Sequence, residues 1–169
     1  METSPLGASS SQQGFQKLAY GEEFLCSLLQ WRIERQPRGG RSGGILLDPG
    51  GQIEQTFAWG LGTRTNNEAE WLALLQGLQI LQDKNCQKVL IFGDSKHVIS
   101  KLINGYPKGV VNCRRLYNKA KLLMLSSYEP FHILRINNTA ADSMANLGAS
   151  IPQGQFKQNG NPPTLKYVP

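Results

Sequence analysis

Three carboxylates lie where side chains of that type could work together on one reaction. Glu70 falls on the apolar stripe of a predicted helix, Asp94 follows a β-rich run, and Asp142 lies in the first turn of another predicted helix. A carboxylate on a buried face is costly unless a metal ion, a cation or hydrogen bonds compensate its charge. In α/β sheets ligands bind beyond the carboxyl ends of strands, where Asp94 is expected. Together the three residues predict a site for a hard cation, Mg²⁺ or Mn²⁺.

Each carboxylate also has a purely structural interpretation. Glu70 could pair with an arginine, Asp94 could cap the helix expected from Ser95, and Asp142 could favour a helix N-terminus through the dipole. Taken alone, Asp142 is better explained by capping. The combination, beside a basic surface, favours cleavage of a phosphodiester, in which two metal ions stabilise the attacking and the leaving oxygen.

Hydrophobic periodicity predicts the elements that must position these residues. Helices are expected at 68–81, 95–102, 113–126 and 140–148, and strands at 24–30, 44–48, 52–60, 88–93 and 131–135. This order predicts an α/β fold with a five-stranded mixed sheet, in which the first three strands are antiparallel, the later ones parallel, and helices flank the sheet. Residues 1–20 are expected to form a flexible arm, 21–150 the domain, and 151–169 a disordered tail.

The charge balance predicts a polyanionic partner. The chain has 18 Lys and Arg against 12 Asp and Glu, which favours nucleic acid or an anionic membrane surface as partner. No apolar run approaches the roughly 18 residues of a membrane span. Four guanidinium groups, each able to fork onto a phosphate, lie in a stretch expected to form a basic loop or a disrupted hairpin. They belong to Arg32, Arg35, Arg38 and Arg41.

The cysteines indicate the compartment. Cys26, Cys86 and Cys113 are scattered, without a Cys-x-x-Cys pair, so neither a zinc site nor a disulfide framework is expected. An odd number of thiols fits a reducing, intracellular environment. The N-terminus lacks a secretory pattern. Nucleus, cytoplasm and organelle remain open.

Three motifs in this order resemble ribonuclease H. They are TNNEAE at 65–70 followed by ALLQGL at 73–78, FGDS at 92–95, and HILR at 132–135 followed by Asn138, Ala141 and Asp142. The amino-acid sequences of these motifs are closest to those of the plant and Ty3/gypsy retroelement branch, and the resemblance covers about residues 24–150. It implies a ribonuclease H-like fold in which Glu70, Asp94 and Asp142 are catalytic metal ligands.

The resemblance also implies a substrate. Thr65, Asn66 and Asn67 would contact phosphate and the minor groove of an RNA–DNA hybrid, which this family recognises by shape and 2′-hydroxyls more than by base sequence. His132 is expected to have a packing or edge role, and His97 is expected to be a solvated helix residue.

The pattern breaks at the first strand. In the family this strand ends in Asp-Gly, whereas counting back from the 43–51 segment puts Gln30-Trp31 there. A glutamine amide brings no negative charge to a shared metal position. A shorter loop would instead bring Glu34 into place.

Three functions follow from this departure. The first is a catalytically impaired protein that binds RNA–DNA hybrid or structured RNA, derived from a retroelement and serving as a ribonucleoprotein subunit. The second is an active Mg²⁺-dependent endoribonuclease that cleaves the RNA strand of hybrids. The third is a protein-interaction module that keeps only the fold.

Overall fold

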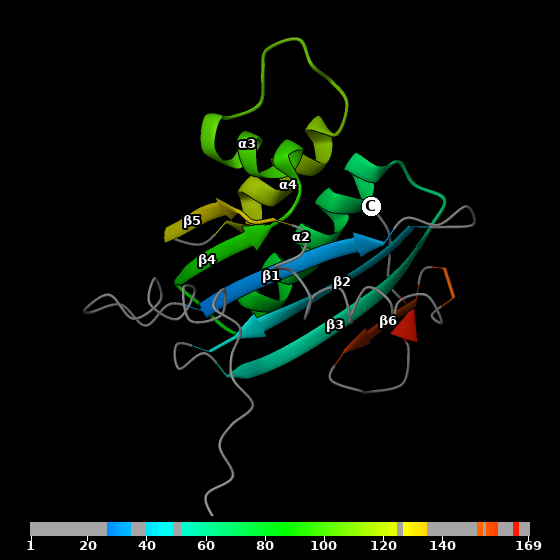
Figure 1. The fold of residues 1–169 in the computed structure, drawn as a ribbon, viewed down its shortest axis with the longest axis vertical. Helices are drawn as coiled ribbons and strands as arrows, with labels where there is room; N and C mark the ends of the chain where they lie inside the picture. The colour runs from blue at the N-terminus through cyan, green and yellow to red at the C-terminus, as the bar shows by residue number, and fades with distance from the viewer. Residues whose placement is uncertain are drawn as a thin grey trace, which may run out of the picture.

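The strand pairing divides the sheet into an antiparallel half and a parallel half. The structure, a computed structural model, describes residues 27–34, 40–48, 52–124, 127–134, 152–153, 155–158 and 164–165. The antiparallel half contains β1 (Ser27–Glu34), β2 (Gly40–Leu47) and β3 (Ile53–Gly62). In the parallel half, β4 (Lys88–Gly93) pairs with β1, and β5 (Ser127–His132) pairs with β4. This confirms the predicted mixed α/β sheet (Figure 1).

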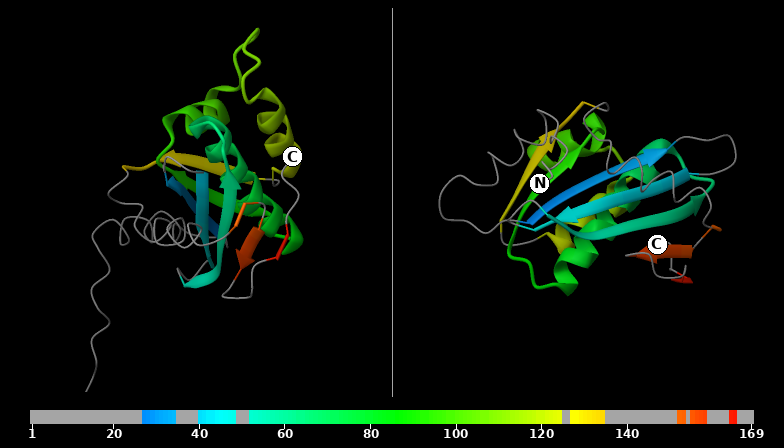
Figure 2. Two further views of the ribbon diagram at one scale, coloured as in Figure 1. Left: turned by 90° about the vertical axis from the view of Figure 1, so that its right-hand side faces the viewer. Right: turned by 60° about the horizontal axis from the view of Figure 1, so that its bottom comes forward.

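Two further strands make the sheet larger than predicted. Its order is β5-β4-β1-β2-β3-β6-β7, where β6 (Gln155–Gln158) and β7 (Thr164–Leu165) follow the five expected strands. Figure 2 shows β6 alongside the outer edge of β3, with which it pairs antiparallel from Phe57 to Trp59. The prediction of a disordered tail is therefore wrong for these residues. The open edge of β3 supplies hydrogen-bonding groups that a polar segment can satisfy.

The first hairpin is also longer than predicted. Residues 31–34 belong to the stretch predicted to form a basic loop or a disrupted hairpin, and the structure has them as a continuation of β1, paired with β2. Arg32 and Arg41 are therefore strand residues, and Arg35 and Arg38 lie outside the described residues. The arm at 1–20 and the helix predicted at 140–148, which contains Asp142, also lie outside them.

The central helix α2 (Asn66–Asp83) is buried around most of its circumference. It packs against β1 and β2 on one side, and α4 (Arg114–Leu123) packs against it on another. Trp71, Leu74 and Leu78 are fully buried there together with Leu46, Phe57 and Ile91 of the sheet. A helix covered on several sides can be apolar around most of its surface.

Local signals set the bounds of α3 (Lys96–Asn104). The Ser95 hydroxyl accepts a hydrogen bond from the Val98 backbone N–H at 3.3 Å, and the helix ends at Gly105, whose φ of 79° suits glycine. The loop that follows projects away from the sheet before the chain returns as α4 (Figure 1). No helix in the described part of the chain is both long and apolar enough to cross a membrane.

Candidate functional site

Asp94 lies at the junction between β4 and α3. It follows Gly93, the last residue of the strand, and its side chain is half-buried. One carboxylate oxygen, Oδ1, is buried and has no hydrogen-bond partner in the described structure. Burying such an oxygen without a partner costs free energy. Such an oxygen can accept a cation, and the assignment of Asp94 as a metal ligand stays a prediction.

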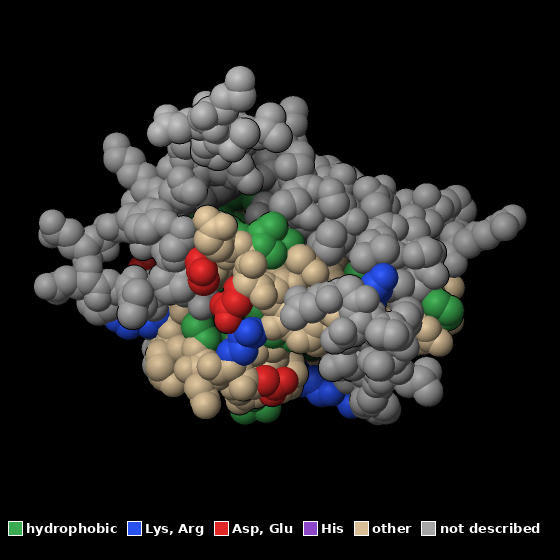
Figure 3. All heavy atoms as spheres, turned by 90° about the horizontal axis from the view of Figure 1, so that it is seen from below, with side chains coloured by type: hydrophobic (Ala, Val, Ile, Leu, Met, Phe, Trp, Pro, Cys, Tyr) green, Lys and Arg blue, Asp and Glu red, His purple; other side chains and the backbone are tan. Residues whose placement is uncertain are grey.

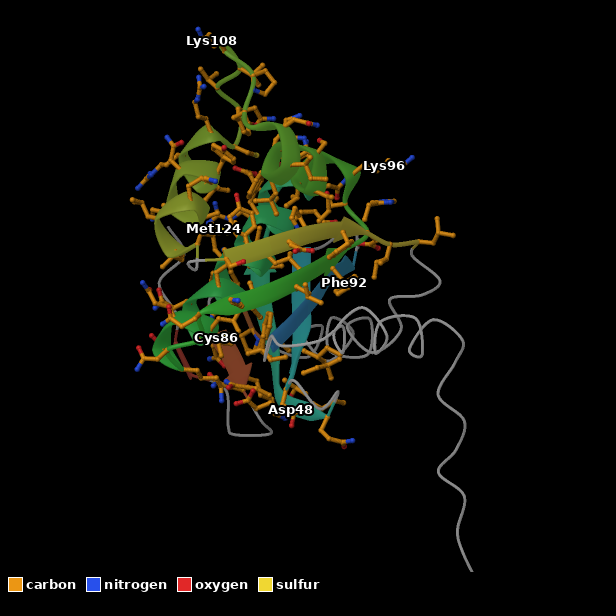
Figure 4. The ribbon with its side chains drawn as sticks, turned by 90° about the vertical axis from the view of Figure 1, so that its left-hand side faces the viewer. Asp48, Cys86, Phe92, Lys96, Lys108 and Met124 are labelled. Carbon is orange, nitrogen blue, oxygen red and sulfur yellow. The ribbon has the colours of Figure 1, made fainter. Side chains whose placement is uncertain are left out.

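Glu70 comes from the helix end that meets this junction. It is the fifth residue of α2 and is half-buried. Its neighbour Trp71 contacts His97 in the first turn of α3, with ring centroids 6.2 Å apart. Because α3 begins two residues after Asp94, this contact connects the start of α2, which contains Glu70, to the β4–α3 junction, which contains Asp94. Figure 4 shows Lys96, the first residue of α3, near the ends of β4 and β5.

The full set of predicted metal ligands remains a prediction. Asp142 lies outside the described residues. Within the described ranges, no three His, Cys, Asp or Glu side chains gather in a way that could hold a metal ion.

The pairing of β1 with β4 sets the level of the first-strand residues. Gln30 is opposite Phe92, and Trp31 is opposite Gly93, where the pairing ends. The next residues on the two strands are Arg32 and Asp94. Arg32 is therefore the β1 residue level with Asp94 along the strand direction. Each residue advances a strand by about 3.3 Å, so Gln30, two residues before Arg32, and Glu34, two residues after it, are each roughly 7 Å away from that level along β1.

The N-terminus of α2 contains the residues predicted to contact nucleic acid. Thr65 is its N-cap: the Thr65 N–H and hydroxyl both donate to Glu68 Oε2 at 2.9 Å, and the Glu68 N–H donates to Thr65 Oγ1 at 3.2 Å. The Thr65 hydroxyl is therefore already used within the helix cap. The spacing Thr-x-x-Glu is a sequence signal for this capping box. Asn66 is exposed and Asn67 half-buried, and their backbone N–H groups precede the first intrahelical hydrogen bonds.

The same cap affects the titration of Glu68. The hydrogen bond from the Thr65 backbone N–H, then that from its hydroxyl, lower the pKa of the Glu68 carboxyl, and Arg64 adds to the effect. The stabilisation from this carboxylate is fully present above the unfolded-state pKa. It is lost as the pH falls through the lower folded-state pKa.

Replacing Thr65 by alanine should lower the free energy of unfolding by about 1 kcal/mol at neutral pH, because the helix loses its cap. The difference from the parent protein should shrink as the pH falls through the lowered pKa of Glu68, because the protonated carboxyl no longer takes part in the charged cap. Urea unfolding at neutral and at acidic pH measures both effects. Thr63→Ala, at a nearby exposed position, is the control. Equal losses in the two variants would contradict a capping role.

An aromatic cluster connects α2 with α3 and α4. The Trp71 ring contacts His97 edge to face and packs in the same way on Tyr117, at 5.7 Å. His97 is half-buried, and burial lowers the pKa of its imidazole, with a further contribution from Lys101. The prediction that His97 is solvated is therefore wrong, because Trp71 covers one side of its ring.

His132 lies beside the candidate site. It is exposed on the edge strand β5, opposite Gly93, and its Nε2 is 3.3 Å from the backbone carbonyl oxygen of Asp94. His132 is therefore next to the backbone of Asp94, a proximity that the HILR motif at 132–135 does not indicate by itself.

Known proteins resemble this chain in sequence and in fold. The model of the reverse transcriptase-like family matches residues 32–148. A ribonuclease HI from Halobacterium salinarum is 28% identical over 106 residues, which are 62% of this chain and 53% of the relative. The chain thus spans about half the length of that curated relative.

Solved structures show the same fold. The ribonuclease H1 of Halobacterium salinarum superimposes with a TM-score of 0.66 at 24% identity, covering 76% of this chain and 98% of that one. The N-terminal ribonuclease H domain of a Mycobacterium tuberculosis protein gives 0.67 at 21% identity, covering 74% and 94%. LC11 ribonuclease H1, in complex with RNA/DNA hybrid, gives 0.64 at 20% identity, covering 72% and 94%. The family match spans more than half of the chain, so the chain belongs to the reverse transcriptase-like family and has a ribonuclease H-like fold.

Proposed function

We propose that this chain is a nucleic-acid-binding domain for RNA–DNA hybrid or structured RNA and that its ability to cleave is impaired. Family membership supports the binding, and two structures of similar fold, LC11 ribonuclease H1 and a foamy viral protease-reverse transcriptase, are described in complex with RNA/DNA hybrid. The impairment is carried by one observation, the β1–β4 register, in which Arg32 follows the residue paired with Gly93. A basic residue at that level opposes binding of a second cation.

The N-terminus of α2 would supply the contacts to the backbone of the nucleic acid. The N–H groups of Asn66 and Asn67 are in the first turn, where phosphate binds readily. Asparagine amides both donate and accept hydrogen bonds, which suits 2′-hydroxyl groups in a minor groove. Arg32 and Arg41, with Arg35 and Arg38 between them, would add the charge that makes binding depend on salt.

The carboxylates fit a divalent cation in part. The buried Asp94 Oδ1 without a partner is the observation that supports a cation there, and Glu70 and Asp142 would complete the oxygen ligands of Mg²⁺ or Mn²⁺. When bound, such an ion would supply charge stabilisation for phosphodiester cleavage. With no carboxylate at the Arg32 level, we expect the affinity for the ion to be low.

A second function is favoured by the same buried oxygen of Asp94. An active Mg²⁺-dependent endoribonuclease would need that oxygen as a ligand and would use Glu34 or a rearranged first strand. The described thiols of Cys86 and Cys113 are free, which agrees with either function inside the cell. A domain that binds nucleic acid but cleaves it poorly would suit a subunit of a ribonucleoprotein.

Binding of a fluorescently labelled RNA–DNA hybrid tests the proposed contacts. Replacing Asn66 and Asn67 together by alanine should weaken binding about 30-fold, since each of the two lost hydrogen bonds contributes on the order of 1 kcal/mol. The logarithm of the binding constant should fall linearly with the logarithm of the salt concentration. The control is Gln82→Ala, at the opposite, exposed end of α2. Equal affinities for the double variant and the control would exclude this helix end from the interface.

Cleavage of the same hybrid in Mg²⁺ or Mn²⁺ separates the two functions. We expect the RNA strand to remain intact under conditions in which a ribonuclease HI cleaves it in a parallel reaction. Cleavage at a similar rate by this chain, abolished by Asp94→Asn, would establish the active enzyme instead.

A further inference from the structure

The segment made of α3, its following loop and α4 has a charge composition unlike the rest of the chain. Residues 95–124, called here the α3–α4 unit, contain seven basic residues and no Asp or Glu. These are Lys96, Lys101, Lys108, Arg114, Arg115, Lys119 and Lys121. On the face of the molecule in Figure 3, by contrast, the coloured acidic and basic side chains are interspersed. The unit thus forms a region of one charge sign.

The same unit exposes aliphatic side chains. Six large hydrophobic residues are exposed in the described part of the chain, and four of them belong to the unit. They are Ile103, Val110, Val111 and Leu122, and the side chains of Val111 and Leu122 are each 81% exposed. Val110 and Val111 are adjacent in the projecting loop that also contains Lys108 (Figure 4). Exposed aliphatic groups amid cations indicate a contact surface more than a solvated one.

The loop is held in place by its aromatic anchor. Tyr106 packs on Tyr117 with centroids 5.2 Å apart, and Tyr117 packs on the fully buried Trp71. The Lys101 Nζ and the Arg114 Cζ lie 5.8 Å and 5.7 Å from the centre of the Tyr106 ring, an arrangement that favours cation–π attraction.

Hydrogen bonds within the loop add to this anchor. The Val110 N–H donates to the Pro107 carbonyl and the Arg114 N–H to the Val111 carbonyl. The two valines are therefore presented by a loop that is shaped before a partner binds, which reduces the entropy lost on binding.

We propose that the α3–α4 unit is a docking site for an acidic protein segment that carries aliphatic or aromatic residues. Carboxylates of such a segment would pair with the basic side chains, and its apolar residues would cover the valines and gain from burial. Both properties of the surface are then used by one partner.

The other possible occupants use only part of the surface. Nucleic acid would pair with the cations through its phosphates but would leave the exposed aliphatic side chains unused. A second copy of the chain would bring the same seven cations against these. Membrane-surface segments typically insert Trp, Phe or Leu. The unit has neither Trp nor Phe, and its exposed leucine, Leu122, is near the end of α4 that lies away from the valine loop.

The first test uses a labelled synthetic peptide of about 20 residues in which Asp and Glu alternate with Leu and Phe. It should bind the full chain, and replacing Val110 and Val111 together by serine should weaken binding at least about tenfold, because the apolar contact is lost. Ile53→Ser, an exposed aliphatic residue on β3, is the matched control and should leave the affinity unchanged. An unchanged thermal unfolding curve would show that the variants are folded. Equal affinities of the valine variant and the parent chain would overturn the proposal.

The second test separates the occupants by their dependence on the valines. Polyglutamate of the same length should bind more weakly than the peptide and should not respond to the valine substitutions. The double variant Lys108→Gln, Arg115→Gln should weaken the binding of both the peptide and polyglutamate and should reduce the salt dependence of their affinities.

The outcomes that overturn the proposal are also distinct. It fails if the valine variant loses affinity for labelled hybrid or phosphatidylserine vesicles as it does for the peptide. It also fails if the valines are required for self-association of the chain. Binding of hybrid at the α2 N-terminus is measured separately, so the proposed function can stand or fall independently of this docking site.

Discussion

Replacing Arg32 by aspartate should create cleavage of the RNA strand of a hybrid in Mg²⁺, at a rate about 10²-fold or more above that of the parent chain. The β1–β4 pairing ends with Trp31 opposite Gly93, so position 32 is the next on β1 and Asp94 the next on β4. A carboxylate at position 32 would bring a negative charge to the β1 position level with Asp94 and would remove a positive charge. The large expected gain follows from how steeply rate depends on the position of reacting groups. The measurement is a gel-based cleavage assay with labelled RNA.

Gln30→Asp is the matched control for this gain. The motif spacing predicts that Gln30 takes the place of the first catalytic Asp, whereas the register puts it opposite Phe92. If Gln30→Asp creates cleavage and Arg32→Asp does not, the motif spacing is right and the register argument is wrong. In whichever variant cleaves, Asp94→Asn should abolish the activity. Either added aspartate should also destabilise the metal-free protein by increasing repulsion among the carboxylates.

Replacing Trp71 by alanine should lower the free energy of unfolding by about 3–5 kcal/mol, the usual cost of removing a large buried aromatic side chain. Trp71 is fully buried and is in contact with His97 of α3 and Tyr117 of α4. Its loss would leave a cavity where the three helices meet. Urea unfolding measures the effect. The control is Leu122→Ala, at an exposed position of α4, which should change the free energy of unfolding by less than about 0.5 kcal/mol.

The Trp71 variant should also change the titration of His97. Burial lowers the pKa of this imidazole, so the fold favours its neutral form. The related stabilisation is present above the unfolded-state pKa and is lost as the pH falls through the lower folded-state value. In folded Trp71→Phe, which keeps part of the contact, the His97 pKa measured by NMR should move toward its ordinary value. An unchanged pKa in that variant would show that Trp71 does not control the burial of His97.

The sequence by itself determined the elements whose signals are local. Strand β4 has the predicted bounds because its apolar run ends at Gly93 before Asp94, and α3 begins after the cap at Ser95. The helix that carries Glu70 follows from the spacing of its apolar residues, but it begins at Asn66, two residues before the predicted start, where Thr65 and Glu68 form a capping box. These signals act between residues a few positions apart, so they can be read along the chain.

Only the tertiary structure decided which residues face one another. The level of β1 relative to Asp94 depends on pairing between strands some 60 residues apart, and a motif count across a loop of variable length cannot set that register. Strand β6 forms on the edge that β3 presents once the sheet exists, so its polar sequence indicates a tail when read alone. His97 is half-buried because Trp71, on another helix, packs against one side of its ring. In each case the deciding contact is made by residues distant in sequence.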